Sequence, residues 1–573
     1  MIRSAKLVNK AFNGFLLASV LTVLGSQAGA LIDALMLSHF IGADAMAGVN
    51  ITKPVTQLIF ALTCIVAQGG SMLTGMAIGN QDKRRANGVF STSFVVLLLM
   101  GLVGSMLPFV CGDSLVHLLC SEPTLMVHTS NYLNVQLYGA LPLILMLALM
   151  MYVAVDGAPK LVTKATIASE ITHVVLGFIF LKFCGWGVVG AAWATNISYT
   201  VAVVLMLSHF REKESLKFSL GGFSLASLGK LLLMGLPMGI STSLIAVRML
   251  GANHAAMTYM GAHGMEAMAV CATLLSFSMI IISGTINSYT PVATVLKGSD
   301  DNRGVALVSR HAMAFMAIGL GVYVALMVAF PGTFASIFGI NDPEAMKIAR
   351  VGIAIHAFNI FMQGFCILIP MYQIYSHKTL SLIVSAGQPL LPMAMFWLLC
   401  AHPCDISPWW GFLIGQVMVL LIIAPYILYK RFTDKSMMPF FLIPRKSADH
   451  LFDVTVPARV EELDATMKET QQFLSGECGA TPQEAVAITV VIDELAQNAI
   501  KHGTASCIDL RVSVTGKQVK VMLHDDGRPF NPTLQPASGD DKAIGLKIIQ
   551  GLATDLTYTH TFSQNVMSYT TTL

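Results

Sequence analysis

Charged residues are scarce in this chain of 573 residues, where Lys, Arg, Asp and Glu make up 12% and hydrophobic residues make up 55%. Because an ordinary soluble domain carries about 25% charged residues, this composition excludes an entirely soluble protein and indicates a polytopic membrane protein. The ten cysteines form no disulfide framework, since several of them lie singly in apolar runs. A P-loop of the form GxxxxGK[ST] is also missing, which excludes an ATP motor of that class.

Long apolar runs fill the first three quarters of the chain. A helix that crosses a bilayer needs about 20 mostly apolar residues, and twelve stretches meet this need. They lie near residues 12–37, 44–78, 89–111, 124–155, 161–183, 186–209, 225–250, 262–296, 305–330, 345–375, 379–400 and 407–429. Several are longer than necessary, so we expect them to tilt, bend or project beyond the bilayer.

Three short motifs recur at offsets of 222, 219 and 220 residues (266 − 44, 301 − 82 and 343 − 123). The pairs are GADAMAGV at 42–49 with GMEAMAV at 264–270, GNQDKRRA at 79–86 with KGSDDNRG at 297–304, and SEPTLMV at 121–127 with NDPEAMKI at 341–348. A common offset predicts duplicated halves, residues 1–215 and 216–436. Each half has six spans, so the two enter the membrane with the same orientation, as parallel transporter repeats do.

The charge changes sign along the chain. Residues 1–450 carry 26 Lys and Arg against 17 Asp and Glu, a net of +9, whereas residues 451–573 carry 9 against 15, a net of −6. This split predicts a membrane part, a basic linker at 437–449 and a soluble domain at 450–573. With twelve spans, 21 Lys and Arg lie on the side of the termini and 4 on the other side. Because positive loops stay inside, we expect both termini in the cytoplasm. We expect the protein to lie in the lipid bilayer of the cytoplasmic (inner) membrane, and we expect no nucleic acid as a partner.

Polar residues inside the apolar runs are the candidates for a transport site, since a charge within a bilayer is costly and usually functional. Asp33 is a carboxylate in the first run. Glu170 and His173 are spaced i, i+3 and share a helix face, where a carboxylate and an imidazole can exchange a proton near neutral pH. These residues predict a cation or proton site in the first half. Polar ties between helices are the alternative.

Two charged residues of the second half are more ambiguous. Glu266 mirrors Asp44 in the repeat, so it is a candidate substrate ligand or a carboxylate near a helix N-terminus. We expect Arg248 to lie at an outer end of its span and to extend its guanidinium toward water.

Several motifs of the membrane part resemble the multidrug and toxic compound extrusion (MATE) transporters. They are LIDALMLSHFIGADAMAGVNITKP at 31–54, GNQDKRRAN at 79–87, VAVDGAPK at 153–160 and GWGVVGAAWATNIS at 185–198, and the similarity covers residues 5–435. The resemblance implies a V-shaped pair of six-helix bundles that exchanges amphipathic or cationic substrates for Na⁺ or H⁺. It places Asp33 on the acidic residue of the first helix and Thr195 on the threonine of the sixth. Where prokaryotic relatives often read Asn-x-x-x-Asp, this chain reads His173-Val-Val-Leu-Gly177, and Glu170 is the candidate replacement for the missing acid.

The soluble region predicts an α/β domain. Residues 450–458 form a strand by pattern, residues 459–474 and 481–502 form helices, and residues 508–514 and 519–523 form a hairpin around Thr515-Gly516. A last strand at 567–573 closes the sheet. The predicted fold class is therefore a polytopic all-α membrane protein of two six-helix bundles with a C-terminal α/β sandwich domain.

Three ordered blocks of the soluble domain suit a nucleotide. Glu494 and Asn498 lie on one helix face, where an amide oxygen and a carboxylate can hold Mg²⁺ and position a nucleophile. Asp525 with Gly527 suits a carboxylate that binds an adenine amino group, and Gly545 opens a helix whose N-terminus faces phosphate. A Glu and an Asn at this spacing also occur on ordinary solvated helices.

These blocks, with VPARVEELDATMKETQQFL at 456–474, resemble the histidine-kinase-like ATPases and specifically the anti-sigma-factor serine kinases. The resemblance implies Asn498 as the Mg²⁺ ligand, Glu494 as catalytic base and Asp525 on the adenine of ATP. The usual Gly-x-Gly of the last block is Ala543-Ile544-Gly545, which weakens the case for tight ATP binding. A docking domain without catalysis is the alternative.

The sequence thus predicts a secondary multidrug or organic-cation exporter driven by Na⁺ or H⁺ antiport, with an ATP-binding regulatory domain. One alternative is a membrane sensor whose kinase-like domain phosphorylates a protein partner. Another is a flippase for a lipid-linked sugar.

Overall fold

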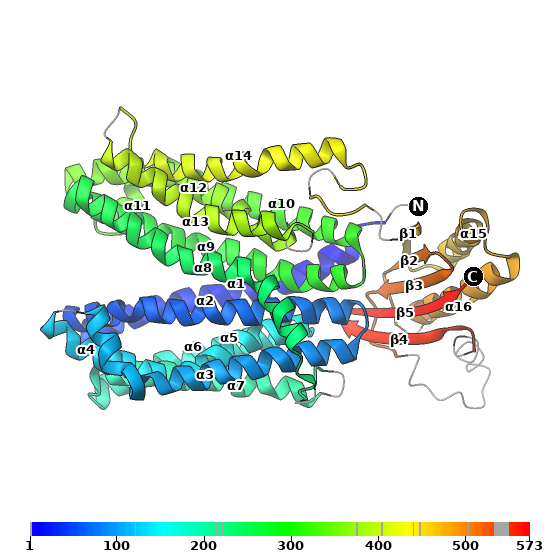
Figure 1. Ribbon diagram of the computed structural model, residues 1–573, viewed down its shortest axis with the longest axis horizontal. Helices are drawn as coiled ribbons and strands as arrows, with labels where there is room; N and C mark the ends of the chain where they lie inside the picture. Colours follow the sequence, from blue (N-terminus) through cyan, green and yellow to red (C-terminus); the bar gives the residue numbers. More distant parts are fainter. Residues whose placement is uncertain are drawn as a thin grey trace.

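The computed structural model describes a long helical bundle with a small sheet domain at one end (Figure 1). The described residues are 3–120, 122–212, 215–219, 222–373, 376–402, 405–438, 441–445, 448–501, 503–531, 549 and 551–573. We call the end of the bundle that carries the sheet the domain end and the opposite end the far end.

The first half of the chain forms one bundle, the N-lobe. Its helices are α1 (Lys6–Phe40), α2 (Ala43–Gly79), α3 (Lys83–Leu119), α4 (Pro123–Tyr138), α5 (Ala140–Val155), α6 (Pro159–Phe178) and α7 (Gly187–Leu207). Helices α4 and α5 pass together as one span bent by 55°. The bend lies at Gly139, where the Asn196 amide of α7 packs so closely that a Cβ would clash.

The second half forms the C-lobe, which lies above the N-lobe in Figure 1. Its helices are α8 (Leu225–Ala255), α9 (Gly261–Gly298), α10 (Asn302–Ala329), α11 (Pro331–Ile337), α12 (Pro343–Gln373), α13 (Lys378–Ala401) and α14 (Trp410–Thr433). The short helix α11 begins at Pro331 and was not expected from the sequence.

The number of spans fits the prediction when one long segment is divided. Within the described residues ten helices are long and apolar enough to cross a membrane, or eleven if the bent pair is one span. One of them runs over 74 residues, Leu225–Gly298, which would be about 111 Å of straight helix against a hydrocarbon core of about 30 Å. It breaks at Gly261, whose φ is +66°. Counting α8 and α9 separately gives twelve spans.

The two lobes meet through α1, α2, α8 and α9. The N-terminal part of α1 packs against α9 and α10, because Val8, Phe12 and Phe15 share one apolar core with Ile286 and Val308. The C-terminal part of α1 packs within the N-lobe, where Met36 and Leu37 share a core with α2, α4 and α7. Helix α1 therefore passes from the C-lobe at the domain end to the N-lobe at the far end.

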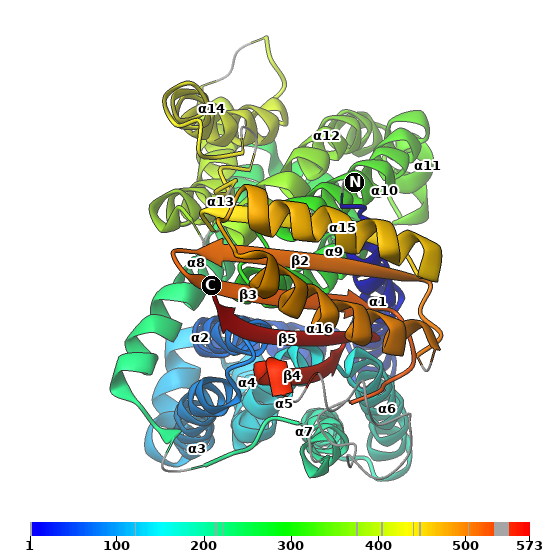
Figure 2. The same ribbon diagram turned by 90° about the vertical axis from the view of Figure 1, so that its right-hand side faces the viewer.

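The C-terminal domain is a five-stranded antiparallel sheet with two helices. The strands are β1 (His450–Pro457), β2 (Cys507–Thr515), β3 (Gln518–Asp525), β4 (Thr554–Thr561) and β5 (Gln564–Thr572), in the order β1-β2-β3-β5-β4. Helices α15 (Val460–Gly476) and α16 (Pro482–Lys501) cover the face turned away from the bundle (Figure 2). Alternate strand residues such as Val454, Leu510 and Val521 fill the core beneath these helices, while the intervening, mostly polar residues face the bundle.

This architecture confirms the predicted fold class. The expected strand, two helices and hairpin are present, and Gly516 has the positive φ of +58° that the hairpin turn needs. Strand β4 was missed, because TDLTYTHT alternates threonine with charged and aromatic residues and carries little apolar signal.

Candidate functional site

A cavity of about 570 Å³ lies inside the bundle. Helices α1, α2, α5, α6 and α7 of the N-lobe supply most of its wall, and α9 of the C-lobe closes one side. Its polar lining includes Ser26, Asp33, Gln68, Tyr132, Gln136, Glu170, His173, Thr195, Tyr199, Asn287 and Thr290. Four residues singled out from the sequence, Asp33, Glu170, His173 and Thr195, are thus brought to one place.

Asp33 and His173 lie side by side in the wall of the cavity. The Asp33 Oδ1 atom of α1 lies 3.5 Å from His173 Nε2 of α6. The Asp33 side chain is 20% exposed and the His173 side chain 11%, so both remain accessible from the cavity. This geometry allows a proton or another cation to be held between helices that belong to the same lobe.

Glu170 lies one turn before His173 and also faces α1. A Cβ at Gly29 of α1 would collide with the Glu170 carboxylate, so the glycine is what lets this side chain lie against α1. Two carboxylates, Asp33 and Glu170, therefore line the same cavity from adjacent helices. Two carboxylates on one cavity favour the binding of a cation or proton, which relieves their repulsion.

Two tyrosines at the site were missed by the sequence reading. Tyr132 of α4 lines the cavity together with Thr195, and Tyr199 lines it one turn after Thr195. A tyrosine within an apolar helix is the signal that could have found them, since its hydroxyl needs a partner when buried. Together they add aromatic surface, which suits an amphipathic or cationic ligand.

Glu266 does not join this site. It is exposed near the start of α9 and does not line the cavity. The reason is its place in the helix, five residues after the break at Gly261, at the end of α9 remote from Gly298 and the domain. Its role as an ion or substrate ligand has no geometric support.

Arg248 corrects a second expectation. It does not extend toward water at an outer end, because it is only 6% exposed inside the C-lobe. Its Nη1 donates to Gln363 Oε1 of α12 at 3.1 Å, and its guanidinium lies 5.7 Å from the ring centroid of Phe412. The packing of α8 against α12 and α14, which no local pattern reveals, buries this cation.

The nucleotide candidates of the C-terminal domain meet at the end of β3. Asp525 Oδ1 accepts hydrogen bonds from Gly527 N and Asn565 Nδ2, both at 2.8 Å. Its Oδ2 is buried and has no partner among the residues that the structure describes. An adenine amino group is a donor that fits this free acceptor, and burial raises the pKa of the Asp525 carboxyl. Asn565 is a site residue that the sequence reading missed.

Backbone contacts connect this turn to the helix of the predicted magnesium ligand. Gly503 N donates to Asn498 O at 3.2 Å, and Arg528 N donates to Gly503 O at 2.6 Å. A Cβ at Gly527 would press on Gly503 O, which explains the glycine. Glu494 and Asn498 are half-buried on one face of α16. Among the described residues neither side chain makes a hydrogen bond or ion pair, so both are available to a bound Mg²⁺ and nucleotide.

The third block lies outside the described residues. Gly545, predicted to face phosphate, and Ala543 before it both fall in 532–548. The part of the site that the structure describes therefore comprises the predicted adenine ligand, Asp525, and the predicted metal ligand, Asn498, and the acceptor oxygens of both side chains suit the amino group and the Mg²⁺ of Mg·ATP.

Two family models match the chain. The MatE family matches residues 18–179, and the histidine kinase-like ATPase domain matches residues 456–570. A probable multidrug resistance protein of Bacillus subtilis strain 168, YoeA, is 24% identical over 396 residues, which cover 68% of this chain and 76% of the relative. The multidrug export protein MepA of Staphylococcus haemolyticus is 22% identical over 330 residues, or 57% of this chain and 71% of the relative.

Solved structures share the membrane fold. The MATE transporter VcmN of Vibrio cholerae superposes with a TM-score of 0.69 at 16% identity, covering 75% of this chain and 98% of its own. A transporter of the MOP superfamily from Pyrococcus furiosus gives 0.64 at 20% identity, covering 74% and 98%. At these identities the likeness establishes the fold of the membrane part.

Proposed function

We propose that this chain, a MatE membrane domain fused to a histidine kinase-like ATPase domain, is a secondary exporter of small amphipathic or cationic substrates, driven by Na⁺ or H⁺. The observation that carries the proposal is the pair of carboxylates, Asp33 and Glu170, on one membrane cavity. The names of the relatives, which describe multidrug resistance and export, support the same substrate class.

Shared carboxylates explain how exchange works. A cationic substrate and a coupling cation both neutralise Asp33 and Glu170, so binding of one disfavours the other. His173, at ion-pair distance from Asp33, offers a place for a proton when H⁺ is the coupling ion. Thr195 and Tyr132 add hydroxyl groups to the wall of the same cavity.

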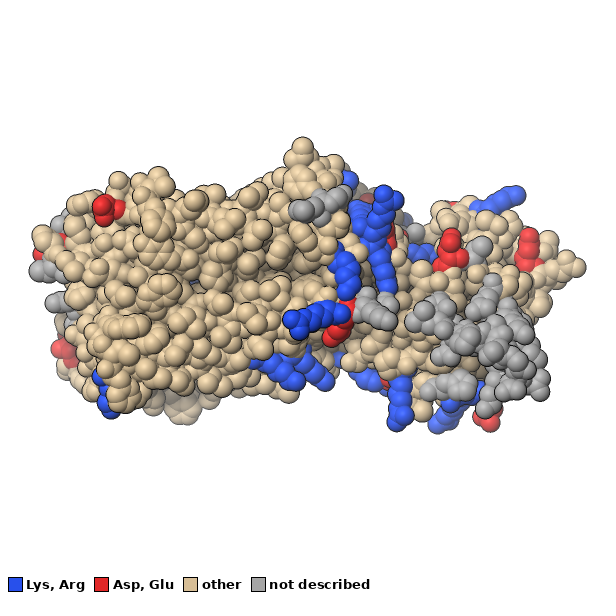
Figure 3. Space-filling model, turned by 90° about the horizontal axis from the view of Figure 1, so that it is seen from below, with Lys and Arg blue, Asp and Glu red and all other residues tan. Residues whose placement is uncertain are grey.

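Orientation follows from the basic residues. Lys and Arg gather where the bundle meets the C-terminal domain (Figure 3). Exposed examples at this end are Arg84, Arg85, Lys160, Lys164, Arg211, Lys217 and Lys230. Since positive loops stay in the cytoplasm, we place the domain end and both termini there, in the cytoplasmic membrane.

The ATPase-like domain acts as a regulator in this proposal. Asp526, next to the adenine position, forms an ion pair with Lys10 of α1 at 2.7 Å, and α1 also carries Asp33. Nucleotide binding at Asp525 therefore has a physical route to the helix of the transport site. Energy for export comes from the ion gradient, because the chain contains no P-loop motif.

A sensor that phosphorylates a protein partner is the second candidate. It is favoured by Glu494, which lies one turn before Asn498 and has no partner among the described residues, as a catalytic base requires. Phosphorylation of a serine-containing partner that depends on a membrane ligand, without any flux, would select this function.

Flux in a reconstituted system tests the export function. The full-length protein is placed in proteoliposomes with a cationic dye on one side and a Na⁺ or pH gradient imposed. We expect dye to move against its own gradient, and an ionophore that collapses the ion gradient to stop it. Equal dye movement with and without both gradients would reject secondary export.

A further inference from the structure

The side of the sheet that faces the bundle is polar and yet covered. Asp509 and Arg511 of β2 and Gln564 of β5 are all less than 9% exposed, although both described long helices of their own domain, α15 and α16, lie on the opposite face (Figure 2). Polar side chains are buried only where partners satisfy them. Here the partners come from the membrane part of the chain.

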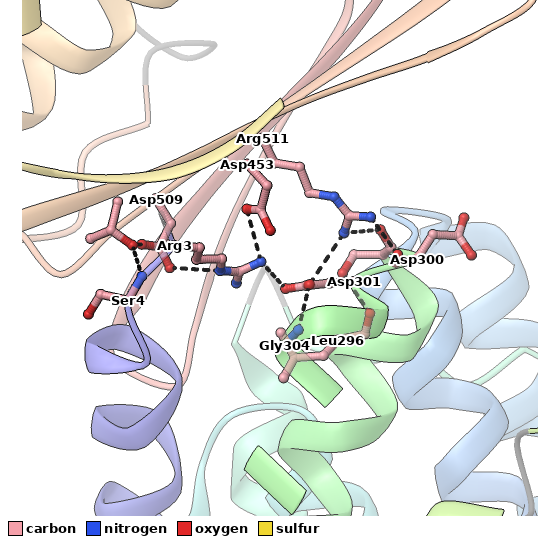
Figure 4. A network of polar contacts seen from close by, with 11 residues as sticks. Arg3, Ser4, Leu296, Asp300, Asp301, Gly304, Asp453, Asp509 and Arg511 are labelled. Carbon is pink, nitrogen blue, oxygen red and sulfur yellow. Dashed lines mark hydrogen bonds and ion pairs between the residues drawn. The ribbon is translucent and has the colours of Figure 1, made fainter. Parts of the chain in front are cut away.

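A cluster of buried charges joins the sheet to the C-lobe (Figure 4). Arg3, just before α1, lies 2.6 Å from Asp301 of the α9–α10 loop and 3.4 Å from both Asp453 and Asp509 of the sheet. Arg511 of the sheet adds a second cation. It donates to the carbonyls of Ser299 and Asp300 at 3.4 and 2.5 Å. Asp301, Asp453 and Asp509 are thus all paired with the guanidinium of Arg3. Buried charges need such partners.

The N-lobe presents the matching loop to the same sheet. Lys520 Nζ of β3 donates to Asn80 Oδ1 at 3.1 Å, and Gln81 Nε2 donates to Thr559 Oγ1 of β4 at 2.9 Å. These contacts are hydrogen bonds without a paired charge, and the Lys520 bond is exposed. The N-lobe contact is therefore weaker than the C-lobe contact.

The two loops are equivalent positions of the repeat. Gln81 and Asp300 are 219 residues apart (300 − 81) and both have positive φ, 60° and 58°. The following residues, Asp82 and Asp301, both cap a helix by accepting from the backbone three residues on. The sheet thus binds the same turn twice, once in each lobe.

Between these loops the lobes touch backbone to backbone. A Cβ at Gly79 would clash with the Val295 carbonyl, and one at Gly298 would clash with the Met76 carbonyl. Helices α2 and α9 therefore have no room for a side chain between them at the domain end. The sheet lies across the place where the bundle is closed.

We propose that the bundle-facing side of the sheet is a docking surface for this pair of repeat-related loops, and that docking holds the domain end of the bundle closed. A body that binds both loops at one spacing stabilises that spacing over any other. This proposal deepens the proposed function and rests on it for its consequence, that a docked domain prevents the cavity from opening to the cytoplasm.

The difference in contact strength indicates which lobe separates from the sheet when the domain end opens. The buried charges tie the sheet to Asp301, and Arg3 leads into the part of α1 that packs on the C-lobe. Lys10 of the same helix holds Asp526. When the domain end opens, the sheet stays with α1 and the C-lobe, and the N-lobe loop leaves Lys520 and Thr559.

Spin labels test this directly in the full-length protein in lipid nanodiscs. Labels on unnatural amino acids at exposed positions 84 (N-lobe) and 310 (C-lobe) leave the native cysteines unchanged. Lys520→Met with Thr559→Val removes the two hydrogen bonds to the N-lobe loop by substitutions of similar size on the domain. The matched control is Lys468→Met, an exposed lysine on α15.

Double electron–electron resonance measures the distance between the two spin labels. We expect the double variant to show a long-distance population several-fold larger than in the wild type, and the control to match the wild type. A double variant with the wild-type distance distribution would overturn the proposal. The measurement needs no transport, so a wild type that moves no dye while the double variant widens would defeat the export function and leave docking standing.

Discussion

The interiors of the two lobes carry opposite charge. The N-lobe holds the carboxylates Asp33 and Glu170 on an accessible cavity. The C-lobe buries Arg248 with Gln363 and Phe412, and helices α8, α13 and α14 contain no Asp or Glu. The repeat is nevertheless clear in the loops, where Asp82 and Asp301 cap equivalent helices.

The two lobes share the turns at the domain end but differ in the charged residues of their interiors. Duplication has kept the turns at the domain end, which a symmetric opening and closing of the bundle requires. It has not kept the cavity carboxylates that we propose as the cation site. A fixed guanidinium repels cations, whereas two carboxylates attract them, so we assign cation exchange to the N-lobe alone.

Asp33→Asn should affect transport more than any other substitution considered for the two lobes. The change is nearly isosteric and removes one of two cavity carboxylates, so we expect gradient-driven dye efflux in proteoliposomes to fall to the level of empty vesicles. Glu266→Gln is the matched control, because it removes a carboxylate that is exposed outside the cavity, and its efflux should stay within about twofold of the wild type. Wild-type efflux in Asp33→Asn would show that the charge is dispensable.

Replacing the buried cation of the C-lobe tests whether Arg248 has a part in transport. Arg248→Met keeps the length of the side chain and leaves Gln363 Oε1 without its donor, which costs about 1–3 kcal/mol for a buried group. We expect a lower melting temperature in detergent and retained, gradient-driven efflux. Efflux lost in Arg248→Met but kept in Arg248→Lys would mean that the C-lobe charge takes part in exchange.

If the ion gradient drives export through the N-lobe cavity, ATP regulates export and does not drive it. Asn498→Ala removes the predicted Mg²⁺ ligand, so we expect Mg·ATP binding to the full-length protein to weaken by about tenfold, or 1.4 kcal/mol, in calorimetry. Gln497→Ala is the control, since Gln497 pairs with Asp493 and Lys501 instead. Gradient-driven efflux should persist in Asn498→Ala. Its complete loss would point to an ATP-driven cycle.

The smallest effect concerns pH and docking. His524 of β3 faces Arg3, Asp301 and Arg511, and burial with the two arginines lowers its pKa to about 4. A histidine released to water has a pKa near 6.5, so its contribution to docking is complete above pH 6.5 and declines as the pH falls toward 4. Asp509 opposes this change, because burial raises its pKa to about 6 and the docked state gains a proton below that pH.

The two groups can be separated by His524→Gln. At pH 5.5, one unit below 6.5, the wild type should lose about 1 kcal/mol of docking stability through His524, and the variant should not. The long-distance population between labels at 84 and 310 gives the measurement. An equal pH response in both proteins would remove His524 from the interface energetics.

The local sequence pattern was sufficient to predict the charged residues of the cavity. Asp33, Glu170 and His173 stand out because each is polar in an apolar run, and helical spacing places the last two on one face. The fate of Arg248 and Glu266 could not be read in this way, because it depends on which neighbour packs against α8 and where α9 begins. The docking network was also beyond the sequence, since Arg3, Asp301 and Asp509 are hundreds of residues apart and none is unusual in its own segment.

Competition between substrate and cation tests the assignment of exchange to the N-lobe most directly. Fluorescence anisotropy of a cationic dye bound to the full-length protein in nanodiscs is followed while Na⁺ is raised at fixed pH, and while pH is lowered at fixed Na⁺. We expect one of these cations to raise the apparent Kd of the dye in the wild type, and this competition to disappear in Asp33→Asn. A wild-type Kd that is unchanged by both cations, or competition that persists in Asp33→Asn, would contradict it.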